Sequence, residues 1–134
     1  MVKKLTNKEL VENMGKLNLF QSREQKYMEG TGKKLLTGHF DIAYAINKTK
    51  GHIEQALKPY NKTLEEMLQE CNSEEAKQKG VVKIRDDKKD VWENGMKQLQ
   101  EEETEVDIHM IKLTEIKGID FDSTDLSCLE FMIE

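Results

Sequence analysis

The densest set of chemically capable side chains in this sequence is acidic. It consists of Glu101, Glu102, Glu103, Glu105 and Asp107, followed by His109. Paired carboxylates can act as acid and base or bind a divalent cation, but enzymes usually draw them from several elements around a cleft. A run at the end of one predicted helix instead opposes the helix dipole. We therefore expect these six residues to form a partner-binding surface that a basic group compensates, with no catalytic role.

Other motifs that could carry chemistry are incomplete. Residues 29–34 read Glu-Gly-Thr-Gly-Lys-Lys, but a phosphate-binding P-loop needs glycine at Tyr27 and a hydroxyl residue at Lys34. The histidines His39, His52 and His109 lack the short spacing of metal ligands. We therefore expect a protein that is not an enzyme and that holds no metal and no cofactor.

Charge is divided unevenly along the chain. Residues 1–60 carry eleven Lys and Arg against six Asp and Glu, whereas residues 61–134 carry ten against twenty. The acidic half favours a basic protein surface over a nucleic acid. The lysines of the basic half are dispersed among acids and lack an aromatic-rich strand, which also argues against a nucleic-acid partner.

The sequence contains no run of about 18 apolar residues, so we expect no membrane partner. The first residues also lack an apolar stretch that could serve as a secretory signal. Cys71 and Cys128 both fall at apolar helical positions, and we expect them to be reduced and buried. These features predict a cytoplasmic protein.

An apolar stripe at helical spacing is the strongest structural signal. It consists of Leu36, Phe40, Ala43, Ile46, Ile53, Leu57, Tyr60, Leu64, Met67 and Cys71. Steps of three and four residues keep these side chains on one face of a helix. Pro59 interrupts the backbone hydrogen bonds, but the stripe continues in phase beyond it. We favour one kinked helix over two separate helices.

Shorter elements flank this helix. Thr6 and Glu9 form a capping box, which predicts a helix through Leu17 or Phe20. Residues 81–84 and 106–113 are strand candidates that could pair around a helix at 88–103. We predict one mostly helical α+β domain, 1–134, in which a long helix packs in a helical hairpin with a two-stranded β element. Its parts are an N-terminal helix and loop (1–35), the long helix (36–73), a strand–helix–strand segment (81–113) and a C-terminal helix (123–133).

The order of these elements carries a family resemblance. The segment Lys-Pro-Tyr-Asn-Lys-Thr-Leu-Glu-Glu-Met-Leu (58–68) precedes Asp86-Asp87, a helix with Leu99, and the C-terminal segment 105–134. Residues 36–134 resemble small uncharacterised proteins of tailed bacteriophages and prophages. The resemblance implies a phage origin, an accessory role and the host cytoplasm, and it transfers no site residues.

These observations favour a non-enzymatic phage protein that acts by binding another protein. It would be a host-takeover or anti-defence adaptor or inhibitor, or an assembly factor, and its partner would offer a basic surface or add a strand to 106–113. One alternative is a structural virion component, and another is a sponge for nucleotides or small molecules. The helices at 88–103 and 126–133 cover only part of the long stripe, so a homodimer is a further expectation.

Overall fold

A computed structural model describes the whole chain, residues 1–134, and is mostly helical. The α-helices are α1 (Asn7–Thr31), α2 (Phe40–Cys71), α3 (Glu74–Lys79), α4 (Lys89–Glu101) and α5 (Ser123–Leu129). The strands β1 (Val2–Thr6) and β2 (Glu103–Asp107) form one antiparallel sheet. Short 3-10 turns are η1 (Asp86–Lys88), η2 (Leu113–Ile116) and η3 (Glu130–Met132). The predicted mostly helical α+β class is confirmed.

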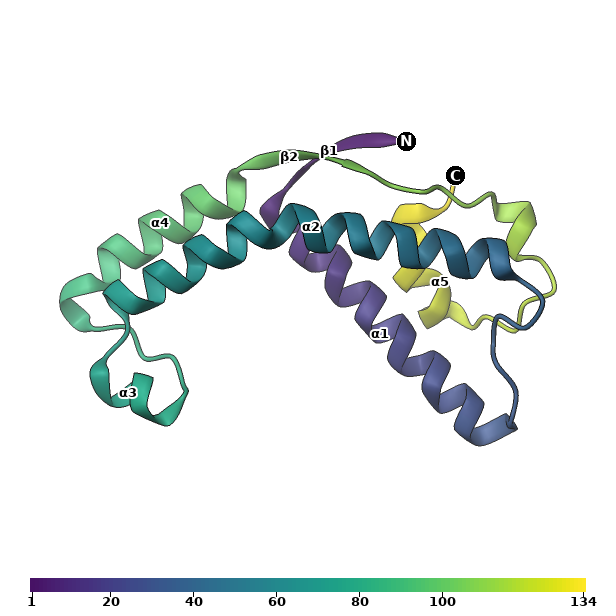
Figure 1. The fold of residues 1–134 in the computed structure, drawn as a ribbon, viewed down its shortest axis with the longest axis horizontal. Coiled ribbons are helices and arrows are strands. Elements are labelled where there is room, and N and C mark those ends of the chain that lie inside the picture. The colour runs from purple at the N-terminus through teal and green to yellow at the C-terminus, as the bar shows by residue number, and fades with distance from the viewer.

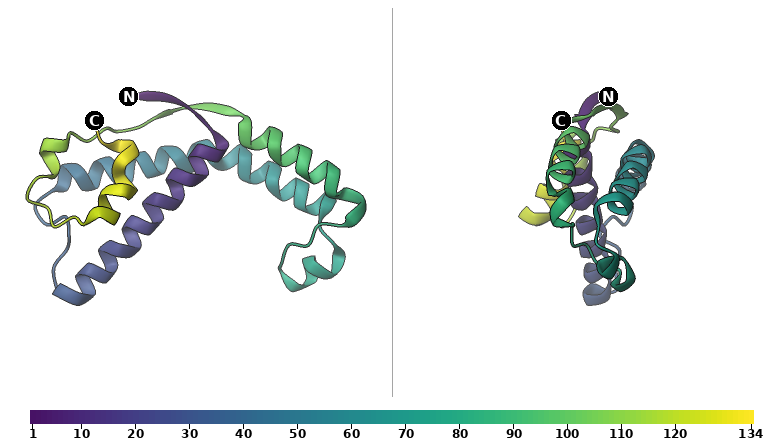
Figure 2. Two further views of the ribbon diagram at one scale, coloured as in Figure 1. Left: turned by 180° about the vertical axis from the view of Figure 1, so that it is seen from behind. Right: turned by 90° about the vertical axis from the view of Figure 1, so that its left-hand side faces the viewer.

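The helices form two layers (Figures 1 and 2). α2 makes one layer, and α1, α4 and α5 together make the second layer, on one side of α2. α1 diverges from α2 to make a V, with α5 beside the opening and the 32–39 loop joining the two arms. α4 runs along the C-terminal half of α2, and α3 lies at the far end. We call α3, α4 and residues 60–71 of α2 the distal hairpin.

α2 is continuous across Pro59, as the phase of the apolar stripe predicted. Pro59 lacks an N–H group, so the preceding turn loses one hydrogen bond, and the ring displaces the carbonyl four residues earlier. Figure 1 shows that the helix changes direction near its middle, which agrees with a kinked helix. α2 therefore connects the N-terminal and distal parts of the molecule as one helix.

The stripe itself begins on a different face from the one predicted. Phe40 is 83% exposed, whereas Ile42 and Ala45 are buried. Ile42 and Ile46 belong to the same buried cluster as Ile111 of the C-terminal segment, so that segment covers this face of α2 and leaves Phe40 outside. Further along, Ile53 and Leu57 are buried as predicted. The last part of the stripe, at Leu64 and Met67, is only half-buried.

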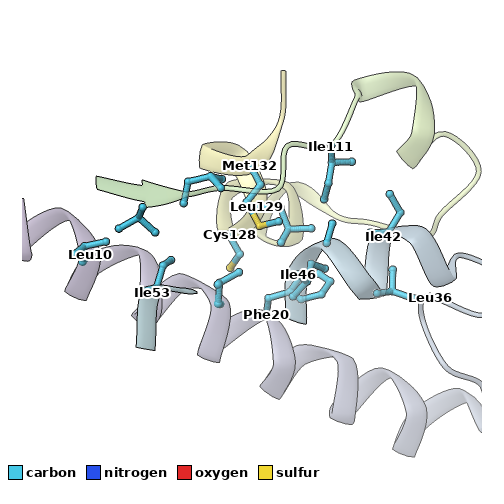
Figure 3. Packing of buried hydrophobic residues seen from close by; sticks show 14 of the residues in the cluster. Leu10, Phe20, Leu36, Ile42, Ile46, Ile53, Ile111, Cys128, Leu129 and Met132 are labelled. Atoms are coloured by element: carbon cyan, nitrogen blue, oxygen red, sulfur yellow. The ribbon is translucent and has the colours of Figure 1, made fainter. Parts of the chain in front are cut away.

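One hydrophobic cluster of 18 buried residues lies beneath the V and draws on α1, α2, β2 and the C-terminal segment. Figure 3 labels Leu10, Phe20, Leu36, Ile42, Ile46, Ile53, Ile111, Cys128, Leu129 and Met132. Tyr60 is the last α2 residue in the cluster. In the rest of the distal hairpin only Cys71 and Ala76 are buried apolar residues. The core thus supports α2 from its first turns to Tyr60, about two thirds of its length.

The predicted pairing of residues 81–84 with residues 106–113 is wrong. Val81 and Val82 are exposed, and residues 81–84 contribute one isolated bridge between Ile84 and Asn72. In the structure the two segments lie at opposite ends of α4, a helix about 20 Å long at 1.5 Å per residue, so they do not meet. β2 pairs instead with β1, whose residues precede the capping box.

α1 extends to Thr31, well past the predicted end near Phe20. A polar contact holds this extra length against the N-terminus of α5. Arg23 donates from Nε to Asp125 Oδ1 at 2.8 Å and also pairs with Asp122. Asp122 and Asp125 form the capping box of α5. The apolar periodicity fades after Phe20 because charged residues take over the contacts of this face.

The Arg23 cluster predicts a specific pH dependence of stability. A hydrogen bond from the Asp125 N–H and the charge of Arg23 hold the pKa of Asp122 below its ordinary value. A carboxyl with a lowered pKa in the folded state stabilises the fold above about pH 4, and this contribution is lost as the pH falls further. Asp122→Asn keeps a capping side chain but removes the charge.

We expect the free-energy difference between wild type and Asp122→Asn to be largest near pH 7 and to shrink below about pH 4. Urea unfolding across this range measures it. Glu65→Gln is the matched control, because Glu65 is exposed and makes no ion pair. A difference that stays constant with pH would contradict the assigned role of Asp122.

Two helical glycines should respond differently to alanine. A Cβ at Gly51 would meet nothing within 4 Å, so Gly51→Ala should raise the free energy of unfolding by about 1 kcal/mol. A Cβ at Gly95 would lie 2.8 Å from Met67 Cε, so Gly95→Ala must displace that side chain and gain less. Denaturant unfolding compares the two variants, and equal gains would contradict the close packing of α4 on α2.

Candidate functional site

Three of the predicted partner-binding carboxylates lie on the outer face of the two-stranded sheet, and Glu101 and Glu102 lie at the end of α4. Glu103, Glu105 and Asp107 are exposed, while Val106 between them is buried. In the antiparallel register Lys4 of β1 lies opposite Glu105. Residues opposite each other project from the same face. The basic compensation predicted for the acidic run thus comes in part from the chain itself.

This compensation is incomplete. Lys4 Nζ lies 3.9 Å from Glu103 Oε2, and both side chains are largely exposed. The Met1 ammonium lies 3.0 Å from Asp107 Oδ1 and is the main cause that lowers the pKa of Asp107. Glu101, Glu102 and Glu105 make no ion pair. The junction of α4 and β2 therefore keeps an excess of negative charge.

The chain after β2 is held by α2. Ile108 is fully buried, and the His109 N–H donates to Thr49 Oγ1 at 3.0 Å. His52 Nδ1 of α2 lies 2.8 Å from the Asp107 carbonyl oxygen. These contacts place α2 beside the segment that the sequence offered as an exposed sheet edge. A partner strand could reach only the parts of the β element that α2 leaves open.

His109 does not lie with Glu101, Glu102 and Glu103. Its ring makes an edge-to-face contact with Tyr44 at 5.7 Å between centroids, on the N-terminal half of α2. An extended chain rises about 3.3 Å per residue, so six residues of it separate Glu103 from His109 by roughly 20 Å. The six predicted residues therefore form two groups, one at the end of α4 and one over α2.

The group at the end of α4 adjoins a groove that the sequence did not indicate. This groove has a volume of about 490 Å³ and runs between α4 and the start of α1. Its lining residues are Thr6, Lys8, Trp92, Glu93, Met96, Lys97, Gln100 and Glu101. We call it the α4 groove. Trp92 and Met96 were predicted to cover the α2 stripe, and both are only half-buried.

The end of α4 is fixed against α1. Asn7 Nδ2 donates to the Leu99 carbonyl oxygen at 2.7 Å, and the Asn7 N–H donates to the Glu102 carbonyl oxygen at 2.9 Å. Both acceptors belong to the last turn of α4, whose carbonyl groups lack partners within the helix. These bonds hold Glu101 at the rim of the groove.

The remaining motifs have structural explanations. Gly30 and Thr31 close the last turn of α1, and Gly32 caps it with φ of +74°, so the 29–34 segment is a helix end. Cys71 and Cys128 are buried free thiols, and burial raises the pKa of Cys128.

Charge reversal at Lys4 tests the sheet register. Lys4→Glu places like charges opposite each other and should lower the free energy of unfolding by about 0.5–1 kcal/mol at low salt. Adding Glu105→Lys should restore most of the loss, because it re-creates an opposite-charge pair in the same register. Urea unfolding of the two single variants and the double variant measures the coupling. Strictly additive effects would rule out a direct interaction between the two positions.

None of the side chains gathers into a group of three His, Cys, Asp or Glu residues that could hold a metal ion. None of the helices is both long and apolar enough to cross a membrane. Comparisons with protein-family models, with curated proteins and with solved structures gave no match. The function must therefore be inferred from the surfaces described above.

Proposed function

We propose that this protein has no reaction of its own and acts by binding a basic, amphipathic helix of another protein in the α4 groove. The observation that carries the proposal is the exposure of α4. Its apolar side chains recur at helical spacing, yet none of its residues is buried. An amphipathic helix is stabilised mainly by burying its apolar face, so α4 leaves part of that stabilisation to a further element.

The two sides of α4 make different contacts. Gly95 packs closely on Met67 of α2, which holds the helix in the distal hairpin. Trp92 and Met96 lie one turn apart and line the open groove. Tryptophan and methionine are enriched in the cores of protein interfaces, where they contribute large contact areas. A partner helix with apolar residues at the same spacing would cover both side chains.

The charges around the groove favour a basic partner. Residues 89–107 contain seven Asp and Glu against two Lys. The groove lining itself is balanced, with Glu93 and Glu101 against Lys8 and Lys97, and the excess of carboxylates lies beside it. Glu102 and Glu103 continue the negative surface at the helix C-terminus, which the helix dipole makes more negative. Lysine or arginine on the flanks of a bound helix would compensate these carboxylates and speed association.

The resemblance to phage proteins suggests where this binding would take place. An accessory protein of a phage would bind a host or phage protein in the host cytoplasm, as a takeover or anti-defence adaptor or as an assembly factor. α1 of a second copy also offers a suitable face, since Val11 and Leu19 are exposed and Lys8 and Lys16 flank them. A homodimer, and with it a role as a virion component, is therefore the alternative outcome of the experiment below.

The only tryptophan of the chain reports directly on the groove. We expect a synthetic amphipathic helix of leucine and lysine to shift the Trp92 emission to the blue, and a leucine–glutamate helix of equal length to leave it unchanged. Binding should weaken as salt is added. Met96→Glu should lower the affinity at least about tenfold, because it places a charge in the apolar contact.

Val91→Glu is the matched control, because Val91 is exposed on α4 and does not line the groove. It should leave the affinity unchanged. Light scattering over a range of concentrations identifies self-association, which would favour the homodimer. Equal binding of the two peptides, or equal loss in the two variants, would refute the proposed mode of recognition.

A further inference from the structure

A second cavity lies at the opposite end of α2 from the α4 groove. It has a volume of about 560 Å³, within the range of small-molecule sites. It lies in the opening of the V, between the C-terminal half of α1, the 32–39 loop and the first turns of α2 (Figure 1). Its lining residues are Gln21, Glu24, Gln25, Met28, Lys34, Leu35, Leu36, Thr37, Gly38, Phe40 and Ala43.

Most of the side-chain surface of this cavity is apolar. Leu35 and Leu36 are buried and belong to the hydrophobic core, so they form a fixed wall. Phe40 and Met28 are exposed on α2 and α1, respectively. Figure 3 shows Leu36 next to the first turn of α2, at the edge of the core. The exposed Phe40 ring, which the sequence assigned to the core, is free to cover an apolar ligand.

Glu24 is the only carboxylate of the lining. It is half-buried and makes no ion pair, and burial, with the charge of Asp125 as a second cause, raises its pKa. Neither neighbouring cation pairs with Glu24. Arg23 is bound to Asp122 and Asp125, and the exposed Lys34 forms no ion pair with Glu24.

The two amide side chains of the wall are also engaged. Gln21 Oε1 accepts a hydrogen bond from Lys50 Nζ at 2.6 Å, and Gln25 Nε2 donates to Glu29 at 3.3 Å. Glu24 and Lys34 are therefore the two charged lining side chains without an ion-pair partner, and Glu24 is the less exposed of the two. A carboxylate that is partly removed from water interacts more strongly with a cation than an exposed one does.

We propose that this cavity binds a small organic ammonium ion, with the ammonium group on Glu24 and an apolar body against Leu35, Leu36 and Phe40. The aromatic face of Phe40 adds attraction for a cation, and apolar walls favour a hydrophobic body. A metal ion would find too few oxygen ligands here. An organic anion would be repelled by Glu24 and would find only the exposed Lys34 as a counter-charge. This site is independent of the α4 groove.

Phenethylammonium is a suitable probe, with phenethyl alcohol and 3-phenylpropionate as neutral and anionic analogues of similar shape. Titration of isotopically labelled protein by NMR at pH 7 should shift the amide signals of the 32–39 loop with the cation. We expect the two analogues to bind at least about tenfold more weakly. Binding of the cation should also weaken as the pH is lowered toward the pKa of Glu24, since a neutral carboxyl offers no charge.

Glu24→Gln should lower the affinity for phenethylammonium about tenfold and remove the preference over the alcohol. Glu54→Gln is the control, because Glu54 is exposed on α2 and does not line the cavity. Phe40→Ala should weaken all three ligands, since it removes a shared apolar contact. Contacts between the probe ring and the methyl groups of Leu36 and Ala43, detected by nuclear Overhauser effects, locate the ligand without any substitution.

The absence of shifts at millimolar probe, equal affinities for the three ligands, or unchanged binding by a folded Glu24→Gln would each overturn the proposal. Failure of the α4-groove experiment would leave these measurements unaffected, because they report on different residues.

Discussion

The rest of the chain must cover the apolar face of one helix of 32 residues, α2. α2 extends about 48 Å at 1.5 Å per residue, and it carries apolar side chains along most of that length. The buried core covers this helix only as far as Tyr60. α1, β2 and the C-terminal segment contribute to that core, whereas α4 runs along the remaining, distal part of α2. The exposed apolar residues of α4 are a direct consequence of this uneven cover.

Polar contacts decide where the covering elements lie. Arg23 joins α1 to the capping box of α5, so the C-terminal segment is held against the opening of the V. Asn7 performs the corresponding task at the other end of α1, where it binds the last turn of α4. Each contact links a side chain of α1 to the terminus of another helix, where backbone groups lack intrahelical partners. The hydrophobic core alone would not fix how α4 and α5 are oriented against α1.

The two proposed binding surfaces follow from the same division of α2. The α4 groove lies where cover is thin, next to an excess of carboxylates. The cavity at the opening of the V lies where α1 and α2 diverge, and Glu24 makes no ion pair there. Both surfaces combine incomplete apolar contact with carboxylates that make no ion pair. For this reason we propose an apolar, cationic ligand for each.

The sequence alone determined the features that depend on local spacing. The steps of the apolar stripe established α2 through Pro59, and the Thr6–Glu9 capping box marked the start of α1. The alternation of Val106 and Ile108 with acidic residues predicted their burial correctly. These features follow from helix and strand periods, which a chain carries without knowledge of its neighbours.

Only the tertiary structure decided which segments meet. The pairing of β1 with β2 joins residues about 100 positions apart, and neither strand contains a local signal for its partner. The exposure of Phe40 and the half-burial of Trp92 depend on how many elements reach each face of α2 and α4, which no periodicity encodes. Of the predicted partner-binding residues, Glu101 adjoins the α4 groove, whereas Asp107 and His109 are held over α2. The extended chain of β2 carries Asp107 and His109 away from the end of α4 at a fixed rise per residue. Contacts with α2, which are distant in the sequence, then hold these two residues in place.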